Sequence, residues 1–590
     1  MFDKNRLTKL REEMKKNGDK SYIILTGDPH SSEYVASKFI AERFYFSPFT
    51  GSDGSLVVTL DGAYLFTDGR YFIQAEKELA DSSVTLMKMG TKGCPTIAEF
   101  IAQNDLYPTA GNLFYMPEGF YEGVAKNGIV NDRDYSYLVE NKPELSKDKV
   151  FALDEKLFTL SFKEKVAKVA SEIENKGADS IIITTLDDIA YILNWRGNDI
   201  ECTPVFYSFL YINKNNEVHL FIDKDKLSDV DYSNIHVHEY DDVVDFIKEK
   251  ANEIILVDKT KINAKLYNLI AKPLNGKSPS YLMKAVKGPV EIENIKRIHE
   301  LDGVAMLKFY DFLYTNLGKN LSEYEYAEEL EKYRRQSKDC FELSFETIAA
   351  VGENAAQMHY GPTKDKSSIV TLNDNVLLVD SGGQYFGGTT DITRTFLLKE
   401  PDAELRRDYT LTLKSVINLT TSIFMDGCAG TAIDIKAREI MWRLGMDYKC
   451  GTGHGVGYIL GVHEGPNGFR YKHVPERDDG SKLEPGMITT IEPGVYKASK
   501  YGIRIENELL TVPAFETEDG VFYKFETVTY CPIETKYLDL GLLSDDEISW
   551  INNYHQMVYE KLSKRIQGNE RLLALLKMLT KAVERQKWIT

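Results

Sequence analysis

The chain has 590 residues, of which 43% are hydrophobic and 27% are charged. That length exceeds what one hydrophobic core supports, so several domains are expected, and the composition is that of an ordinary globular protein. The net charge of −18 argues against nucleic acid and anionic membranes as main partners, because both repel an acidic surface.

The N-terminal residues and the cysteines bear on the cellular compartment. MFDKNRLTKLREEMKK is polar and predicts an amphipathic helix, not a signal peptide or a membrane anchor. No stretch approaches the roughly 20 apolar residues that span a bilayer. The six cysteines lie scattered without CxxC spacing, which is typical of reduced thiols. We therefore expect a cytoplasmic protein.

Two alternating α/β blocks are predicted before residue 286. The strands of the first are YIILTG, SLVVTL and AYLFTD, and those of the second are DSIIITTL, FYSFLYI and EVHLFID. FSPFTG and a later LFTD in the first block are echoed by ILNWRG and LFID in the second. We interpret the blocks as a duplicated domain, with chance similarity as the alternative, and place them at 1–155 and 156–285.

Residues 286–590 form the third predicted domain. A helix is predicted after Pro289, since proline is favoured in a first helical turn. The segment SDDEISWINNYHQMVYEKLSKRI is predicted to be helical, with Ser544 and Glu547 in a capping box. The last 25 or so residues are prone to form an appended helix.

Two aspartates follow apolar strand patterns in this domain. NVLLVD predicts a buried strand that ends at Asp380 and turns on Gly382 and Gly383. TTDITRTF predicts the next strand, and Asp391 lies there on the face opposite the packing residues. Their separation of eleven residues predicts two strands paired around one hairpin.

Two glutamates and a histidine lie in comparable phrases. Glu492 closes a strand before Pro493 and Gly494, and Glu506 lies in the alternating GIRIENELL with Arg504 and Glu508 on its face. Taken alone, that face would be expected in solvent. His454 lies between glycines in GTGHGVG, where glycine permits a close backbone approach.

Together these residues have the composition of a two-metal site. Four carboxylates carry enough negative charge for two divalent cations, and oxygen-rich sites suit hard or borderline ions such as Mn²⁺. The predicted ligands are Asp380, Asp391, His454, Glu492 and Glu506. His359 and His463 lie in neighbouring phrases and are candidates to hold a substrate carbonyl. We expect the other seven histidines, such as His236 and His238, at the surface.

These phrases together resemble the pita-bread metallopeptidases, and most closely their cytosolic three-domain aminopeptidase P (Xaa-Pro aminopeptidase) group. The order of the acids and TTDITRT, GHGVG and EPG carry the resemblance, which extends through TGSDGSLVVT and LDDIAYILNWRGNDIECTPVFYSF. It implies an α/β (α+β) fold: two creatinase-like N-terminal α/β domains followed by a pita-bread catalytic domain. It also implies a homodimer.

The resemblance further implies a role for each site residue. Asp380 would bind one metal through both oxygens, Asp391 and Glu506 would bridge two metals, and a hydroxide between them would be the nucleophile. Glu492 would complete the second metal site with His454. Glu492 would also take up the proton of the hydroxide. His359 and His463 would steady the scissile carbonyl, and Arg504 would hold the acids in place.

Cys450 departs from the family pattern. The family usually has a histidine four residues before the metal-binding one, where this chain has a thiol. The resemblance therefore implies a differently shaped pocket on the proline side. The sequence leaves two alternatives for Cys450: an inert buried thiol, or a reactive thiol of low pKa.

The expected activity is cleavage between an N-terminal residue and a penultimate proline in short peptides. Prolidase, which acts on dipeptides, is the nearest alternative, but its members usually have one N-terminal domain. Methionine aminopeptidase needs only a catalytic domain. A non-catalytic peptide-binding homologue would typically have lost metal ligands, all five of which are present here.

Overall fold

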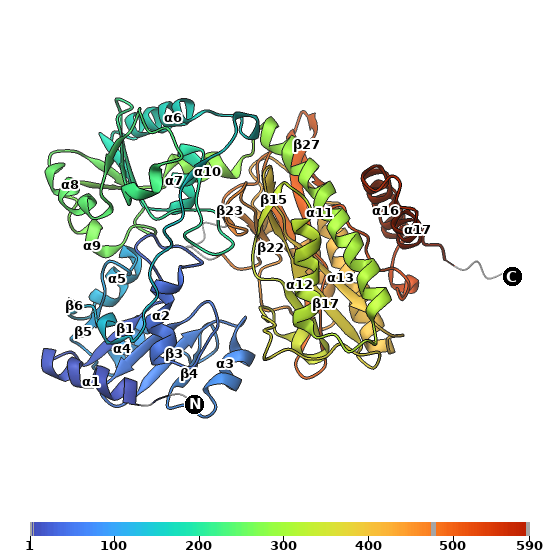
Figure 1. Cartoon of the computed structure of the whole chain (residues 1–590), viewed down its shortest axis with the longest axis horizontal. Coiled ribbons are helices and arrows are strands. Elements are labelled where there is room, and N and C mark those ends of the chain that lie inside the picture. Colours follow the sequence, from blue (N-terminus) through green and yellow to red (C-terminus); the bar gives the residue numbers. More distant parts are fainter. Residues whose placement is uncertain (1–2, 4, 474–479, 586–590) are drawn as a thin grey trace. The chain divides into compact units, whose positions relative to one another are not determined.

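The computed structural model describes residues 3, 5–473 and 480–585. The chain divides into two compact units (Figure 1). Unit 1 comprises Met1–Glu155 and Leu160–Leu282, and unit 2 comprises Lys156–Thr159 and Met283–Thr590. No helix within the described part of the chain is long and apolar enough to cross a membrane.

Unit 1 contains two sheets of the same topology. Among the described residues each has six strands, in the orders β4-β3-β2-β1-β5-β6 and β12-β11-β10-β8-β13-β14. In both, the first strand pairs antiparallel with the second and parallel with the fifth of its set. The common order and sense bear out the interpretation of a duplicated domain.

The strands of the first sheet are β1 Ser21–Ile24, β2 Ser55–Thr59, β3 Ala63–Thr67, β4 Thr85–Lys88, β5 Thr109–Gly111 and β6 Val130–Asp132. Those of the second are β8 Ser180–Ile183, β10 Phe209–Asn213, β11 Val218–Phe221, β12 His236–His238, β13 Ile255–Val257 and β14 Pro273–Asn275. The helices around them are α1 Asn5–Asn17, α2 Ser37–Phe46, α3 Phe72–Leu79, α4 Ile97–Gln103, α5 Glu118–Ala125, α6 Phe162–Asn175, α7 Leu186–Leu193, α8 Val243–Glu249 and α9 Ala264–Tyr267. The boundary between the two units falls within α10 Pro279–Ala285.

Helix α1 confirms the amphipathic helix predicted at the N-terminus. Its buried residues are Leu7, Leu10 and Met14, which recur at the three- and four-residue spacing of one helix face. They pack into the same apolar cluster as Leu56 and Leu65 of the first sheet. The first helix therefore covers this sheet.

Unit 2 is built on a six-stranded sheet and smaller sheets, counted within the described residues. The large sheet has the order β21-β28-β27-β24-β22-β23, and two three-stranded sheets have the orders β15-β18-β19 and β16-β17-β20. Their strands are β15 Cys340–Leu343, β16 Ile348–Val351, β17 Val376–Ser381, β18 Gly383–Tyr385, β19 Gly388–Thr389, β20 Ile392–Leu397, β21 Ile423–Met425, β22 Gly453–Gly455, β23 Glu464–Phe469, β24 Ile488–Ile491, β27 Asn507–Thr517 and β28 Gly520–Thr527. A separate hairpin pairs β25 Gly494–Lys497 with β26 Tyr501–Arg504.

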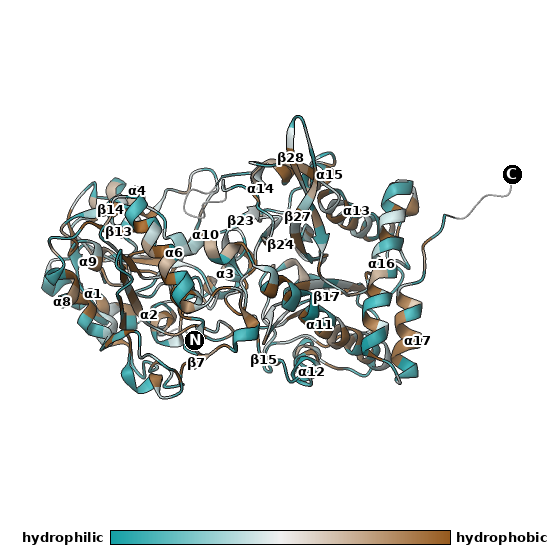
Figure 2. Cartoon of the chain, turned by 90° about the horizontal axis from the view of Figure 1, so that it is seen from above, coloured by the Kyte–Doolittle hydropathy of each residue, from teal (hydrophilic) through white to brown (hydrophobic). Residues whose placement is uncertain are grey.

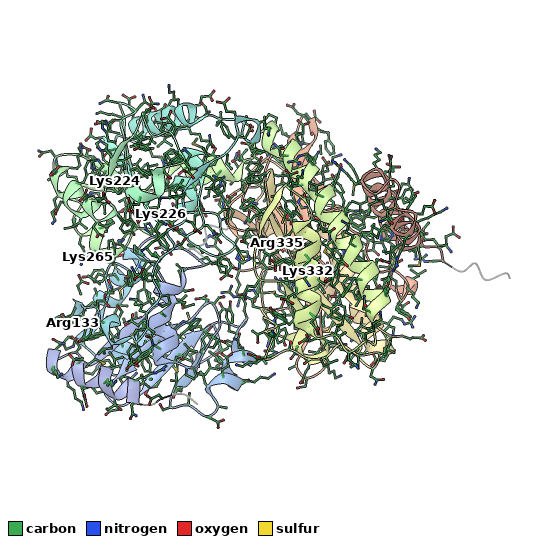
Figure 3. All side chains as sticks on the ribbon, in the orientation of Figure 1. Arg133, Lys224, Lys226, Lys265, Lys332 and Arg335 are labelled. Atoms are coloured by element: carbon green, nitrogen blue, oxygen red, sulfur yellow. The ribbon has the colours of Figure 1, made fainter. Side chains whose placement is uncertain are left out.

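Long helices pack on these sheets. α11 (Pro289–Asn316) begins at the predicted proline and contacts α12 (Glu323–Arg335), α16 (Asp545–Arg565) and α17 (Glu570–Leu579). Figure 3 shows Lys332 and Arg335 near the C-terminal end of α12, where cations oppose the negative end of the helix dipole. The other helices of this unit are α13 Ala403–Thr420, α14 Gly430–Ile433 and α15 Ile435–Trp442.

The C-terminal tail is part of the core of unit 2. Ser544 caps α16 in the predicted capping box with Glu547. In Figure 2, α16 and α17 lie side by side with hydrophobic and hydrophilic residues along both. Leu572 and Leu576 of α17 are buried in the main apolar cluster. The tail therefore forms a helix that covers this core.

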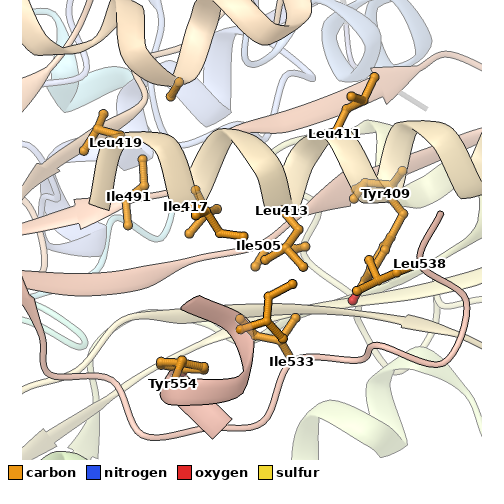
Figure 4. Close-up of a cluster of buried hydrophobic side chains, with 14 of the residues drawn as sticks. Tyr409, Leu411, Leu413, Ile417, Leu419, Ile491, Ile505, Ile533, Leu538 and Tyr554 are labelled. Atoms are coloured by element: carbon orange, nitrogen blue, oxygen red, sulfur yellow. The ribbon is translucent and has the colours of Figure 1, made fainter. Parts of the chain in front are cut away.

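The main cluster also fixes the chain segment that carries two of the candidate site residues. Figure 4 shows Leu413 and Ile417 of α13 directed towards Ile505. Ile503 and Ile505 are fully buried in this cluster. Because side chains alternate along an extended chain, Arg504 and Glu506 are directed to the opposite side.

Several histidines expected at the surface are buried, so that expectation is wrong for His30, His219, His299 and His555. His30 lies in unit 1, where Nδ1 bonds to the carbonyl oxygen of Thr184 at 2.7 Å and Nε2 to the hydroxyl of Tyr240 at 2.7 Å. These bonds satisfy both ring nitrogens, which is what allows an imidazole to be buried.

We predict that His30 makes unit 1 sensitive to acid. Burial lowers the pKa of His30 to about 4, against about 6.5 in an unfolded chain. The neutral ring therefore stabilises the fold fully above pH 6.5, and that contribution is lost as the pH falls towards 4. Linkage gives a loss of about 2 kcal/mol between pH 7.5 and pH 5.

His30→Asn should reduce the acid-induced fall in the thermal unfolding midpoint of unit 1, measured by intrinsic fluorescence at these two pH values. His473→Asn, which replaces an exposed histidine of unit 2, is the control and should retain the wild-type fall. An unchanged pH dependence in His30→Asn would contradict the assignment.

Candidate metal centre

Two neighbouring strands bring the candidate aspartates together. β17 pairs antiparallel with β20, and Asp380 lies opposite Thr393. The predicted pairing around one hairpin is therefore correct: β18 and β19 pair with each other in the same register as β17 and β20, so they extend that hairpin to its turn. The turn is at Gly387 and Gly388, both with positive φ.

Gly382 has a different role from the predicted turn. A Cβ at this position would lie 1.8 Å from the carbonyl oxygen of Thr390, so only glycine permits this close approach of two chain segments. Asp391 follows Thr390 directly. The glycine therefore helps to bring Asp391 close to the end of β17.

His454 lies on β22 and faces two of the acids. Its Nδ1 is 2.9 Å from the carbonyl oxygen of Gly455, and a carbonyl can only accept, so Nδ1 carries the hydrogen. Nε2 then has a free lone pair, and it lies 3.4 Å from oxygens of both Asp391 and Glu492. Three atoms that carry lone pairs thus face one another, as they do around a cation.

Glu492 and Glu506 follow the strand patterns that were predicted for them. Glu492 comes directly after β24, and its backbone N–H donates to the carbonyl of Thr452 at 2.7 Å. Glu506 lies between β26 and β27 and is 1% exposed. Its burial agrees with the convergence of the acids that their combined phrases predict, and not with the solvent-facing position that the strand pattern alone would suggest.

One carboxylate oxygen of each of two acids accepts a hydrogen bond from the protein. Arg504 Nη2 donates to Asp380 Oδ2 at 2.6 Å, and the Thr393 hydroxyl donates to Glu506 Oε2 at 2.8 Å. The guanidinium is itself fixed by Tyr496 and Thr393. Arg504 thus lies where the sequence predicts a cation that holds the acids in place.

The second carboxylate oxygen of each of these acids has no such donor. Asp380 Oδ1 and Glu506 Oε1 are buried and have no hydrogen-bond partner among the described residues. Asp391, His454 and Glu506 each offer a ligand atom, and these atoms lie within 4.8 Å of one another. Bare buried oxygens beside an imidazole lone pair fit divalent cations, since an unsatisfied buried acceptor is otherwise costly.

The electrostatics of the cavity lead to the same conclusion. Burial, and then the charges of Asp380 and Glu492, raise the pKa of Asp391 well above its ordinary range. Burial, followed by the charges of Asp391 and Glu492, does the same to the pKa of Glu506. Without cations, the cavity therefore favours protonated acids; divalent ions would displace those protons.

The two accessory histidines differ in how closely the structure connects them to the cavity. The His463 ring lies 4.2 Å from that of His454, centroid to centroid. His359 follows Met358, whose carbonyl oxygen accepts a hydrogen bond from Arg504 at 3.4 Å. Their catalytic roles stay predictions.

Sequence reasoning missed a buried pair beside the acids. Glu508 Oε1 accepts from the backbone N–H of Asp391 at 2.8 Å, and its other oxygen lies 3.2 Å from His299 Nε2. Glu508 shares the strand face of Arg504 and Glu506, so the alternation was the available signal. His299 lies on α11, far away in the sequence, and no local pattern marks it.

Cys450 lies beside the cavity and is not an activated nucleophile. Burial, and then the negative charge of Glu492, raise the pKa of the Cys450 thiol to about 12. Arg504 and Arg438 oppose this shift but do not reverse it. The reactive, low-pKa thiol is therefore wrong, and the inert thiol is favoured.

An oxygen-rich cavity with one imidazole, built on strands of a pita-bread domain, defines a metallohydrolase. Residues 293–513 match the model of metallopeptidase family M24, and 521–583 match the C-terminal region of peptidase M24. Residues 6–111 and 141–291 each match a creatinase/prolidase N-terminal domain. The chain belongs to metallopeptidase family M24, and the predicted fold class is confirmed.

Relatives match over nearly the whole chain. Xaa-Pro aminopeptidase 1 of Dictyostelium discoideum is 35% identical, over 97% of this chain and 95% of its own length. Aminopeptidase P2 of Arabidopsis thaliana is 35% identical, over 94% and 84%. The crystal structure of X-prolyl aminopeptidase from Caenorhabditis elegans, described as a cytosolic enzyme with a di-nuclear active site, matches with a TM-score of 0.92 at 31% identity, covering 98% of this chain and 99% of that one.

We predict that the Cys450 thiol resists alkylation in the folded protein. At pH 8 a thiol with a pKa of about 12 is ionised to about one part in ten thousand, whereas an ordinary thiol is ionised to about a quarter. Iodoacetamide labelling of the Cys450 peptide, followed by mass spectrometry, should be at least 100-fold slower in the native protein than in urea. Equal rates in the two states would contradict the inert thiol.

Proposed function

We propose that this protein is an aminopeptidase that removes the N-terminal residue from short peptides with proline at the second position. The observation that carries the proposal is the group of acids around His454, whose Nε2 lies 3.4 Å from oxygens of both Asp391 and Glu492. In the same group, Asp380 and Glu506 each have a buried oxygen without a hydrogen-bond partner among the described residues. The full-length similarity to Xaa-Pro aminopeptidases supports the substrate class.

The proposed ligands of two divalent metal ions are Asp380, Asp391, His454, Glu492 and Glu506. Mn²⁺ is the ion we propose, because four carboxylates and one imidazole suit a borderline cation better than a soft one. When bound, two such ions supply an activated water at neutral pH and polarise the scissile carbonyl.

The protein's own groups would then orient and protonate the substrate. Glu492 faces His454 from the more exposed side of the cavity, with its side chain 22% exposed, and we propose it as the acid–base group that carries a proton to the leaving nitrogen. His463, beside His454, would donate to the substrate carbonyl, with His359 as a second donor. Arg504 would hold Asp380 in position.

The N-terminal architecture favours this activity over prolidase. Unit 1 contains two sheets of one topology, and both sequence blocks match a creatinase/prolidase N-terminal domain. Prolidases usually have one such domain. We propose domain limits of 1–155, 156–285 and 286–590.

We further propose that the enzyme is a cytoplasmic homodimer. The similar enzyme from Caenorhabditis elegans is described as cytosolic, and all six cysteines are free thiols, as is usual in a reducing compartment. The homodimer rests on the family resemblance.

We predict that Asp391→Asn lowers kcat/KM by at least 1,000-fold and abolishes the rise in unfolding temperature that Mn²⁺ produces. The metal-free variant should be as stable as the wild type or more stable, because the substitution removes a mutually repelling acid. Asp519→Ala, which replaces an exposed acid at the β27–β28 turn, should retain both activity and the response to Mn²⁺. Turnover retained in Asp391→Asn would refute the two-metal site.

A peptide series tests the substrate class. The Mn²⁺-loaded protein should release arginine from Arg-Pro-Pro and leave Arg-Ala-Pro and Met-Ala-Ser intact. The proposed pocket selects for proline at the second position, because proline forms a tertiary amide and has a fixed φ. Release from Ala-Pro alone would move the assignment to prolidase. No cleavage of any peptide by metal-loaded protein would favour a non-catalytic homologue.

A further inference from the structure

A second group of metal-ligating side chains lies in unit 1, on β11 and the edge strand β12. β11 pairs in parallel with β12, and His219 lies beside His236 and Phe221 beside His238. Glu217 precedes His219 by two residues, so its side chain falls on the same face. One carboxylate and three imidazoles therefore share one side of this sheet edge.

The distances between the ligand atoms of this group are close to those between neighbouring ligand atoms around a bound metal ion. Glu217 Oε1 lies 3.1 Å from His219 Nε2 and 3.8 Å from His236 Nε2. The three ligand atoms lie within 4.8 Å of one another. Around a tetrahedral Zn²⁺ with bonds of about 2.0–2.1 Å, neighbouring ligand atoms are about 3.3 Å apart. Small side-chain adjustments would close the site.

Two further contacts hold the ligand atoms in this orientation. Asn213 Nδ2 donates to Glu217 Oε2 at 2.8 Å, which leaves Oε1 directed at the histidines. His219 Nδ1 lies 2.9 Å from His238 Nε2, so His238 can accept the Nδ1 hydrogen when His219 Nε2 binds an ion. A partner on the second ring nitrogen is the usual support of a metal-binding histidine.

The surroundings leave the group accessible and without a competing cation. Glu217 and His236 are exposed, whereas His219 is buried, with its ring packed 4.8 Å from that of Phe246 on α8. Lys224, labelled in Figure 3, pairs with Glu239 and not with Glu217. Among the described residues, the ion pairs of Glu217 are with His219 and His236.

We propose that Glu217, His219 and His236 bind one borderline divalent transition-metal ion of the Zn²⁺ type, with water in the remaining position. Two imidazoles and one carboxylate are a zinc ligand set, unlike the oxygen-rich set of the candidate centre in unit 2. The ion would link the edge strand β12 to β11, so its effect would be on the stability of unit 1.

Zinc counting on the full-length, Mn²⁺-loaded protein tests the site. After incubation with Zn²⁺ and gel filtration, His236→Ala and Glu217→Gln should retain one equivalent of zinc fewer than the wild type. Glu174→Gln, at an exposed acid of α6, is the matched control and should bind as the wild type does. Peptidase activity should stay within twofold in all three variants, because they lie outside unit 2.

A footprint on the wild type makes the test independent of any variant. Zn²⁺ should slow the reaction of His236 with diethylpyrocarbonate at least fivefold, and Mg²⁺ should not, because Mg²⁺ prefers oxygen ligands. Equal zinc counts in wild type and His236→Ala, or a His236 reaction rate that Zn²⁺ does not change, would overturn the proposal.

Discussion

The mutual repulsion of the buried carboxylates is the constraint around which unit 2 is arranged. Asp380, Asp391 and Glu506 are each less than a tenth exposed, and bringing such charges together without compensation costs several kcal/mol. Asp380 Oδ2 and Glu506 Oε2 each accept a hydrogen bond from the protein. The second oxygen of each of these two acids has no hydrogen-bond partner among the described residues. Divalent ions would supply the positive charge that balances these carboxylates.

Arg394 connects this cavity to the distant parts of the unit. Its Nη1 donates to the carbonyl oxygens of Thr393 and Glu506, and its Nη2 donates to the carbonyl of Cys531 and the hydroxyl of Tyr554. One buried guanidinium thus joins β20, the segment that carries Glu506, and helix α16. The C-terminal helices are therefore structurally linked to the site, although they contribute no candidate ligand.

The features that could be predicted from the sequence are those with a local physical cause. Alternation along GIRIENELL placed Arg504 and Glu506 opposite Ile503 and Ile505, and the proline and serine signals located the starts of α11 and α16. Features that depend on long-range packing could not be predicted. The burial of His299 against Glu508 and the raised pKa of Cys450 both depend on residues far apart in the chain.

The most direct test of the two-metal cavity is anomalous X-ray scattering from crystals loaded with Mn²⁺. Two peaks should appear in unit 2, about 3.5–4 Å apart, with Asp391 and Glu506 between them, Asp380 beside one and His454 beside the other. A single peak at full loading, or peaks away from these side chains, would contradict the account.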